Sequence, residues 1–377
     1  MQPIQQNGVR PSRELQDARR SLPAALYERC EPFFSRFSLS GLDWGDVILG
    51  TRELDPQAPG IDWNAWYSGF WSLASQHAQH AETAISYGRY YSARQLLLRA
   101  SACAHFAEFM HFEQPEAKQQ ARHFAAHLFR RALPYMRNDV AIEMNRVAGG
   151  AVWILRRRRD RGGQPCVVLV NGLDSMNEVE LYGFSRAFLD RGLAVLLFEG
   201  PGQGLRCGVE ALPVDFETLM GAVLSCAQRQ PAIDCNKLGV FGVSFGGYLA
   251  ARCAALFPQS FRACINLSGG FDYDHFESMP PLVRRNFRFV FRKPESEIAD
   301  FARTHLNLRG IPRMRAALLS IHGERDVVVP IEPARRLFDW AAGDKDFIYY
   351  SDERHVCTNS FPDLIPRMAD WMTERLS

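Results

Sequence analysis

The residue types and spacing best suited to chemistry lie in the run 242–246, which reads Gly-Val-Ser-Phe-Gly. It matches G-x-S-x-G, the pattern of a serine that stands on a tight turn between a strand and a helix with its hydroxyl exposed. The apolar run 238–241 predicts the strand, and residues 246–257 predict the helix. The flanking glycines have a steric reason, because such a turn brings two backbone segments together and leaves no room for Cβ atoms. We therefore predict that Ser244 is a nucleophile.

A serine hydroxyl is a poor nucleophile at neutral pH and needs a base that is itself oriented by a carboxylate. Asp326 follows the predicted strand 317–321, and His355 follows the predicted strand 347–350. The carboxyl ends of strands are where ligand sites collect in doubly wound sheets. The order Ser, Asp, His is that of α/β-hydrolases. In this hypothesis Ser244 attacks a carbonyl carbon, His355 accepts and returns the proton, and Asp326 fixes the imidazole tautomer and stabilises the imidazolium.

Other residues offer alternatives for these roles. Glu324, two residues before Asp326, is one alternative acid, and Asp352, three residues before His355, is another. His322 stands at the end of a predicted strand and is interpreted as a structural group. Histidines of the helical part have no partner acid motif, and we interpret them as hydrogen-bonded or exposed helix residues: His80, His105, His111, His123 and His127. The pattern implies no metal site.

Attack on a carbonyl creates an oxyanion that two backbone N–H groups must stabilise, and losing one such donor costs roughly a hundredfold to a thousandfold in rate. We predict that one donor is the N–H of Phe245, directly after the nucleophile. The second is predicted at Leu173, in the loop 171–175 that follows the predicted strand 166–170. Gly172 allows this backbone to turn toward the site.

A glycine-rich run follows the predicted strand 194–198. Residues 199–204 read Glu-Gly-Pro-Gly-Gln-Gly and superficially suggest a dinucleotide-binding loop. The fingerprint G-x-G-x-x-G requires a third glycine, but the residue at that position is Leu205. We interpret the run as a tight structural loop near the site, and we expect no cofactor.

The elements that must position these residues change character near residue 145. Before it, apolar residues recur every three to four positions over 63–74, 87–109 and 115–133, which predicts a helical bundle over about 20–140. After it, short apolar runs alternate with amphipathic segments, the pattern of a mostly parallel sheet with helices on both faces. Further strands are predicted at 151–155 and 263–267, and further helices at 179–190, 215–229, 331–342 and 361–375.

These patterns predict a helical cap domain over residues 1–145 and an α/β-hydrolase catalytic domain over 146–377. About 50 residues separate the predicted strands at 263–267 and 317–321, which is too long for a simple connection. The stretch has its own helical patterns, so we expect a lid-like insertion at about 270–312. The basic run 156–161 lies between two predicted strands and is interpreted as the solvated tip of a hairpin.

Composition excludes several classes of protein. Among 377 residues, 44 Lys and Arg nearly cancel 42 Asp and Glu, so no global field favours nucleic acid or an anionic membrane. A charge-free apolar run of about 18 residues, as a membrane span needs, is absent from the sequence. The nine cysteines form no C-x-x-C pair and are interpreted as reduced structural residues. Residues 1–20 do not read as a secretory signal, so we expect a cytoplasmic protein.

These motifs together resemble those of a known family, the α/β-hydrolases with an N-terminal helical domain that are related to the fermentation-respiration switch esterase and dihydroxypseudooxynicotine hydrolase. The resemblance covers most of the chain and rests on 171–175 (Asn-Gly-Leu-Asp-Ser), 199–204, Ser244, Asp326, His355 and the helical stretch 88–101. It implies that the helical domain caps the active site. Members similar in layout include enzymes that shorten polyketide chains in pigment and anthraquinone biosynthesis by cutting a carbon-carbon bond beside a ketone.

The resemblance implies a cofactor-free serine hydrolase that cleaves a carbon-carbon bond of a β-diketone or polyketide by retro-Claisen chemistry through an acyl-enzyme. A carboxylic ester or thioester hydrolase is the alternative within the same chemistry. A non-catalytic binding protein on a hydrolase scaffold is the alternative from another class. The expected partner is a small-molecule substrate, without nucleic acid or membrane, and a homodimer is a possible assembly.

Two groups of residues are candidates for the substrate pocket. Aromatic residues over 63–91 are compatible with a flat aromatic or polyketide substrate, although helix core and domain interface account for most of them. Asp272, Asp274 and His275 follow the predicted strand 263–267 and could line the pocket and protonate a carbanionic leaving group. They are equally well interpreted as exposed loop residues.

Overall fold

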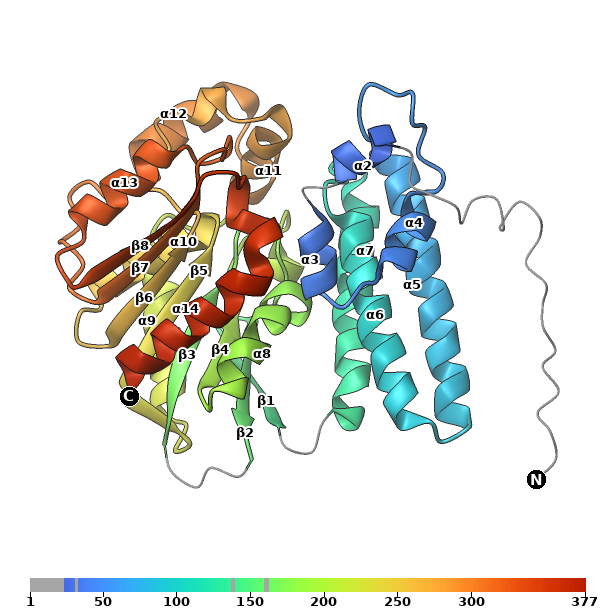
Figure 1. Ribbon diagram of the computed structural model, residues 1–377, viewed down its shortest axis with the longest axis horizontal. Coiled ribbons are helices and arrows are strands. Elements are labelled where there is room, and N and C mark those ends of the chain that lie inside the picture. Colours follow the sequence, from blue (N-terminus) through green and yellow to red (C-terminus); the bar gives the residue numbers. More distant parts are fainter. Residues whose placement is uncertain (1–23, 31–32, 137–139, 159–162) are drawn as a thin grey trace.

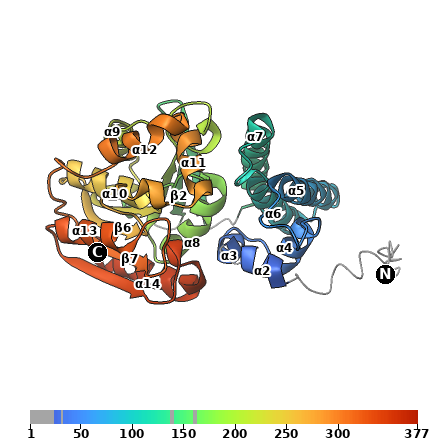
Figure 2. The same ribbon diagram turned by 90° about the horizontal axis from the view of Figure 1, so that it is seen from above.

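The two halves of the chain form two parts that lie side by side, a bundle of helices and a sheet with helices on both faces (Figure 1). The structure, a computed structural model, describes residues 24–377 apart from 31–32, 137–139 and 159–162. Seen from above, α3 (Phe34–Leu39) and α7 (Pro115–Ala132) lie on the side of the bundle that faces the sheet (Figure 2). Residues of these two helices are therefore placed to reach the loops of the second part.

The bundle is built on the predicted apolar stripe of its longest helix. Trp66, Phe70 and Leu73 recur at helical spacing and are all buried. Asp62 caps this helix by accepting hydrogen bonds from backbone N–H groups, among them that of Asn64 at 2.9 Å. Besides α3 and α7, the described helices of the bundle are α2 (Ala24–Cys30), α4 (Trp44–Thr51), α5 (Trp63–Ser86) and α6 (Tyr90–Glu108).

The second part contains one sheet of eight described strands in the order β1-β2-β4-β3-β5-β6-β7-β8. The pairs β1·β2 and β2·β4 are antiparallel, and the other pairs are parallel. The strands are β1 (Val140–Val147), β2 (Gly150–Arg157), β3 (Gln164–Val170), β4 (Ala194–Phe198), β5 (Ile233–Val243), β6 (Phe261–Leu267), β7 (Ala317–Gly323) and β8 (Lys345–Tyr350). This is the α/β-hydrolase architecture that the sequence predicts.

The order of the strands reverses at β3, because the chain runs from β3 to β4 on one side and then returns to β5 on the other. Val170 at the end of β3 is in register with Gly242 near the end of β5. The loops that leave these two strands therefore start next to each other, at a switch point of the kind that holds ligands in open α/β sheets. This topology brings the loop 171–175 to Ser244.

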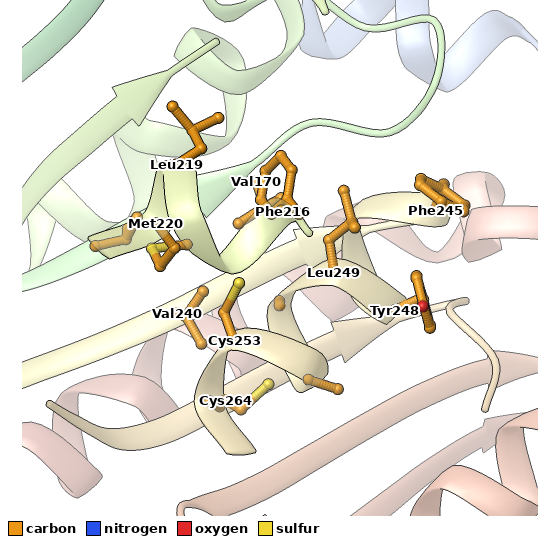
Figure 3. Packing of buried hydrophobic residues seen from close by; sticks show 14 of the residues in the cluster. Val170, Phe216, Leu219, Met220, Val240, Phe245, Tyr248, Leu249, Cys253 and Cys264 are labelled. Carbon is orange, nitrogen blue, oxygen red and sulfur yellow. The ribbon is translucent and has the colours of Figure 1, made fainter. Parts of the chain in front are cut away.

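Side chains that alternate along the strands enter two separate cores. Val168 and Val170 pack on one face of the sheet, while Val167 and Leu169 pack on the other. Figure 3 shows the first core, in which Leu249 and Cys253 lie near Val240. Helices α9 (Phe216–Gln228), α10 (Phe245–Leu256) and α13 (Ile331–Trp340) contribute to the first core, and α8 (Tyr182–Asp190) and α14 (Phe361–Leu376) to the second. All nine cysteines are free thiols, and eight of them are buried.

Strand β1 is not among the strands that the sequence predicts. It begins at Val140 and pairs with β2 along its length, so the boundary expected at residue 145 falls inside this strand. The division into a cap and a catalytic domain remains a prediction. The stretch expected to be a lid-like insertion contains two helices, α11 (Pro281–Phe291) and α12 (Glu295–His305).

The basic run 156–161 is not the tip of a hairpin, because β4 lies between β2 and β3 in the sheet. Arg156 and Arg157 belong to β2, where Arg156 pairs with Glu143 at 3.0 Å and Arg157 donates to the carbonyl oxygen of Leu189 at 2.7 Å. Residues 159–161 lie outside the described part.

Among the described helices, none combines the length and the apolar character that crossing a membrane requires.

Candidate active site

The turn between β5 and α10 holds Ser244 in a left-handed conformation, with φ 56° and ψ −126°. Such a backbone is strained for a residue with a Cβ and persists where the surroundings fix it. Two glycines make the turn possible: a Cβ on Gly242 would lie 1.9 Å from the carbonyl oxygen of Gly246, and one on Gly246 would lie 2.3 Å from that of Val170. The backbone N–H of Ser244 donates to Leu267 at 2.7 Å, which ties the turn to β6.

The structure brings Ser244, His355 and Asp326 into one hydrogen-bonded chain. Ser244 Oγ lies 2.8 Å from His355 Nε2, and His355 Nδ1 lies 2.7 Å from Asp326 Oδ2. Because a carboxylate accepts hydrogen bonds, the proton of the neutral imidazole belongs on Nδ1, which leaves Nε2 free to accept from the serine hydroxyl. This arrangement can draw the proton from Ser244 as the hydroxyl attacks a carbonyl carbon.

Backbone groups hold Asp326 in place. Its Oδ1 accepts hydrogen bonds from the N–H groups of Val328 at 2.8 Å and Val329 at 2.9 Å, and the residue is buried. His322 is fully buried beside it, with Nε2 2.8 Å from the carbonyl oxygen of Val329, and burial lowers the pKa of this histidine. The alternative acid Asp352 instead forms an exposed ion pair with Arg325 at 3.0 Å.

The loop that carries His355 is also held in an unusual conformation. Val356 and Cys357 both have positive φ, at 67° and 51°. The N–H of Val356 donates to Ser268 Oγ at 3.0 Å, and Ser268 N–H donates to Ile321 at the end of β7. These bonds connect the loop to the ends of β6 and β7 and fix the direction of the imidazole.

The loop after β3 lies directly against the nucleophile. A Cβ on Gly172 would lie 3.5 Å from the Cβ of Ser244 and 3.2 Å from the carbonyl oxygen of Val243. Ser175 Oγ shapes the loop by accepting from the N–H of Gly172 at 3.1 Å and donating to Asn171 Oδ1 at 2.9 Å. Leu173 and Phe245, the predicted oxyanion donors, both line the cavity that contains Ser244. Their role as donors remains a prediction.

The glycine-rich run 199–204, which follows β4, holds the loop after β3 in place through hydrogen bonds. Gln203 Nε2 donates to the carbonyl oxygen of Asn171 at 3.4 Å, and Glu199 Oε1 accepts from the N–H of Asn177 at 2.9 Å. Glu199 is buried, and burial together with the negative charge of Glu178 raises its pKa to about 8. The run therefore has the structural place that the sequence predicts for it.

Two arginines of the helical bundle reach across to the same loops. Arg36 on α3 bonds Glu180 through Nε at 2.6 Å and Asp174 through Nη1 at 3.3 Å. Arg122 on α7 donates to the carbonyl oxygens of Gly204 at 2.7 Å and Asp174 at 3.3 Å. The bundle thus contacts the loop that carries the predicted oxyanion donor.

A buried carboxylate balances the charge of Arg122. Glu108 lies 3.0 Å from Arg122 Nε and also pairs with Lys118. Burial opposes ionisation of Glu108, but Arg122 and Lys118 outweigh it and hold its pKa well below the ordinary value. These groups could not be predicted from the sequence, because a lone Arg or Glu on a helix carries no motif.

A cavity of about 350 Å³ opens over Ser244 and His355. Its walls come from both parts of the protein: Phe33 and Phe109 of the bundle, Phe287 of the lid and Val327 of the acid loop. Most of the wall is apolar. Polar groups at the wall include Arg36, Asp174, Glu180, Asn286, Thr358 and Asn359. The cavity suits an apolar molecule with a few oxygen atoms at defined positions.

Contrary to the expectation from the sequence, Asp272, Asp274 and His275 are not among the residues that line this cavity. Asp272 is 1% exposed and accepts two hydrogen bonds from Arg336 at 2.9 and 2.8 Å. Asp274 is bound to Arg309, and His275 Nε2 lies 3.0 Å from the carbonyl oxygen of Val328. Their polar atoms are used to hold the connection after β6. Of the aromatic residues over 63–91, those that face inward, such as Trp66 and Phe70, form the core of the bundle and do not line the cavity.

One group of side chains in the bundle has the composition of a metal site. Asp46, His77 and Cys103 have potential ligand atoms within 4.8 Å of one another. The Asp46 carboxylate is already bound by Arg99 and by His77 Nε2 at 2.9 Å. The guanidinium charge opposes a cation there, and burial keeps the pKa of the Cys103 thiol well above its ordinary value. This cluster is better explained as an internal ion pair.

Comparisons with known proteins place the chain among hydrolases. The model of the family "Esterase FrsA-like" matches residues 62–278, and that of the prolyl oligopeptidase family matches 212–377. The chain is 28% identical to 2,6-dihydropseudooxynicotine hydrolase of Paenarthrobacter nicotinovorans over 359 residues, which cover 91% of each protein. It is 30% identical to the alpha/beta hydrolase psoB of Aspergillus fumigatus over 256 residues, 63% of this chain and 56% of that one.

Solved structures agree with these matches. The crystal structure of the 2,6-dihydroxy-pseudo-oxynicotine hydrolase aligns with a TM-score of 0.80 at 27% identity, covering 91% of this chain and 95% of that one. AbyA5 aligns with a TM-score of 0.68 at 16% identity, covering 93% and 99%, and shares the fold. The protein is a hydrolase with the α/β-hydrolase fold, and it belongs to the FrsA-like esterase family.

Proposed function

We propose that the protein is a serine hydrolase that cleaves a carbon-carbon bond next to a ketone in a β-diketone or polyketide substrate. The observation that carries this proposal is the hydrogen-bonded chain Ser244–His355–Asp326 at the base of a largely apolar cavity. The match to 2,6-dihydropseudooxynicotine hydrolase along 91% of both chains supports a small organic substrate. The proposed substrate is a small ketone, and no cofactor takes part.

In the first half of the reaction Ser244 Oγ attacks a carbonyl carbon while its proton passes to His355 Nε2. The negative charge that forms on the carbonyl oxygen is stabilised by the N–H groups of Leu173 and Phe245. When the intermediate collapses, the carbon-carbon bond breaks and its electron pair moves into the neighbouring carbonyl group, which forms an enolate. The imidazolium returns its proton to the leaving carbon, so a ketone departs and the acyl group stays on Ser244.

The second half of the reaction uses water. His355 Nε2 accepts a proton from the water molecule as its oxygen attacks the acyl carbon, and the same N–H groups stabilise the second oxyanion. Collapse releases a carboxylic acid and returns the proton to Ser244 Oγ. The sum is one diketone and one water molecule converted to one carboxylic acid and one ketone. Asp326 keeps the imidazole in the tautomer that both halves require.

Ester or thioester hydrolysis is the second candidate, and the esterase family match favours it. The same three residues serve both reactions, because the reactions differ in whether a carbon or a heteroatom leaves and is protonated. An apolar cavity accepts either kind of substrate. The two candidates are separated by the products that the purified enzyme forms from a β-diketone and from an ester of matched size.

The catalytic role of Ser244 is tested with a fluorophosphonate, which reacts with an activated serine. We expect labelling of Ser244 in the folded wild-type protein, and loss of both labelling and hydrolysis in Ser244→Ala. Ser225→Ala is the matched control for reagent specificity, because Ser225 is an exposed residue of α9 whose hydroxyl donates to the carbonyl oxygen of Gly221 at 3.0 Å. Undiminished hydrolysis by Ser244→Ala would contradict the proposal.

A further inference from the structure

The lid helix α11 carries a polar side chain on a face that is otherwise apolar. Phe287 and Phe291 of this helix pack against Phe245, the residue after the nucleophile, with ring centroids 5.6 and 5.7 Å apart. These contacts place α11 over the turn that holds Ser244. Asn286 stands next to Phe287 and lines the same cavity as Ser244 and His355.

The side chain of Asn286 borders the cavity and has no protein partner among the described residues. Asn286 is 5% exposed, and within the described part of the chain no hydrogen bond is recorded for its side chain. The cavity wall around it on α11 is apolar, formed by Leu282, Val283 and Phe287. By contrast the buried Asn266 both donates to and accepts from Gly269. Since no protein group uses the Asn286 amide, a ligand in the cavity with a carbonyl oxygen can accept a hydrogen bond from it and gain affinity there.

The chemistry of the proposed reaction identifies the group that Asn286 is suited to bind. In the proposed reaction the N–H groups of Leu173 and Phe245 donate hydrogen bonds to the oxygen of the attacked carbonyl group. A 1,3-dicarbonyl substrate has a second carbonyl oxygen, which receives the electron pair of the broken bond and becomes the enolate oxygen. A neutral amide offers N–H donors without adding charge to an apolar cavity.

We propose that Asn286 donates an N–H hydrogen bond to the second carbonyl oxygen of a 1,3-dicarbonyl substrate, and that this bond strengthens as the oxygen becomes an enolate. The inference rests on the proposed function, because only carbon-carbon cleavage places negative charge on that oxygen. The bond electrons move to the enolate oxygen, Asn286 stabilises the charge, and the proton of the imidazolium then goes to carbon as the ketone re-forms. Asn286 thereby favours a carbon leaving group over the alkoxide of an ester.

The first test compares two substrates. Asn286→Ala and Asn286→Asp are assayed on benzoylacetone, a β-diketone, and on phenyl acetate, an ester without a second carbonyl group. We expect both substitutions to lower kcat/KM for benzoylacetone by about 10- to 100-fold, since one hydrogen bond to a developing anion is lost. For phenyl acetate we expect Asn286→Ala to change kcat/KM by less than about threefold. Arg288→Ala is the control and should leave the ratio of the two values unchanged, because Arg288 is a half-buried residue of α11 that pairs with Glu295 and is not among the residues that line the cavity.

The second test measures binding without turnover. Benzoylacetone and butyrophenone, a monoketone of similar size, are compared for how well they protect Ser244 from fluorophosphonate labelling. Asn286→Ala should raise the concentration of benzoylacetone that halves the labelling rate by about tenfold and leave that of butyrophenone unchanged. Equal changes for both ligands, or equal losses on both substrates, would show that Asn286 only maintains the lid and would overturn the inference.

The two tests separate this inference from the proposed function. One outcome is that wild-type protein does not cleave benzoylacetone but binds it better than butyrophenone, and that Asn286→Ala loses this preference. The proposed carbon-carbon cleavage is then refuted, while the role of Asn286 in binding the dicarbonyl group is supported. If wild-type protein cleaves benzoylacetone and Asn286→Ala cleaves it equally fast, the function stands and the role of Asn286 is refuted.

Discussion

Arg122 of helix α7 donates a hydrogen bond from Nη1 to the carbonyl oxygen of Gly204, 2.7 Å away, although the two residues are 82 positions apart. Its Nη2 reaches the carbonyl oxygen of Asp174 at 3.3 Å, and its Nε pairs with the buried Glu108. A side chain of the helical bundle is therefore part of the support of the loops around Ser244.

Removing Arg122 should weaken both folding and catalysis. Arg122→Met removes one of the cations that pair with the buried carboxylate of Glu108. Breaking a buried ion pair in this way lowers the free energy of unfolding by about 3–5 kcal/mol. We expect a lower free energy of unfolding in urea and a lower kcat. The double variant Arg122→Met with Glu108→Gln should recover part of the stability, because the unpaired charge is gone, but not the kcat, because the bonds to Gly204 and Asp174 are still missing. Recovery of kcat in the double variant would contradict a role of Arg122 in holding these loops.

Asp326 should be the acid that orients His355. Asp326→Asn can keep the hydrogen bonds to Val328 and Val329, but its amide N–H faces His355 Nδ1 and favours the wrong tautomer. We expect kcat on phenyl acetate to fall by about 10³- to 10⁴-fold with little change in thermal stability.

Asp352→Asn is the matched control for this prediction. Asp352 forms an exposed pair with Arg325, and such pairs contribute about 0–1 kcal/mol. Its substitution should leave kcat within about twofold of the wild-type value. A large loss in Asp352→Asn together with an active Asp326→Asn would reverse the assignment of the acid.

The turn before the nucleophile should not tolerate a Cβ. Gly242→Ala would place its methyl group 1.9 Å from the carbonyl oxygen of Gly246, so the turn must open or the protein must lose stability. We expect activity to fall below detection together with a fall in Tm. Gly221→Ala is the control, because a Cβ at Gly221 in α9 would lie 3.5 Å from Phe257, an ordinary contact. It should keep activity and leave Tm unchanged or raised, as alanine favours a helix over glycine. An active and stable Gly242→Ala would show that the turn is less tightly packed.

Glu199 should make the protein less stable as pH rises. Burial, together with Glu178, raises the pKa of Glu199 from its ordinary value of 4.5 to about 8. The folded state therefore holds a proton that the unfolded state releases, so this contribution is fully present below about pH 4.5 and is lost as pH rises to about 8. Glu199→Gln stays neutral and should flatten the fall in Tm across this range.

The control for the pH prediction is Glu210→Gln. Glu210 is exposed and its pKa is lowered by Arg206, so its titration does not contribute between about pH 5 and 8. Tm is measured by thermal unfolding at several pH values for the three proteins. The account of Glu199 is wrong if Glu199→Gln and wild type lose stability in parallel over this range.

The parts of the site that the sequence predicts are those fixed by strand ends. Ser244, Asp326 and His355 each follow an apolar run with turn residues behind it, and parallel strands bring such ends to one edge of a sheet. The loop after β3 was predictable for the same reason. Local pattern and topology together are enough to place these residues near one another.

The parts that the sequence does not predict depend on packing between distant elements. Arg36, Arg122 and Asn286 belong to three different helices, α3, α7 and α11, and have no motif. They reach the site because these helices pack near its loops and its cavity. The sequence gives only a weak indication of a role for Asn286. It is a polar residue that falls, at helical spacing, within the apolar stripe of Val283, Phe287 and Val290. The pocket assignment of Asp272 failed because its ion pair with Arg336 joins segments that are far apart in the sequence.

Strand β1 was missed because only part of it is buried. Its sequence Val-Ala-Ile-Glu-Met-Asn-Arg-Val mixes polar and apolar residues, as is usual for a strand at the edge of a sheet, and it lacks the continuous apolar run of the central strands. It follows the bundle directly, where helical periodicity dominates the pattern. The expected boundary at residue 145 was therefore placed inside it.

The central claim is that Ser244 takes an acyl group from a carbon leaving group. The most direct measurement is product analysis by liquid chromatography after incubating wild-type protein and Ser244→Ala with benzoylacetone, with rapid acid quench and mass spectrometry of the peptide that contains Ser244. The account predicts one carboxylic acid and one ketone in equal amounts with wild type, an acyl group on Ser244 during turnover, and neither with Ser244→Ala. Hydrolysis of phenyl acetate by wild type with benzoylacetone left intact and Ser244 unacylated by it would contradict the claim.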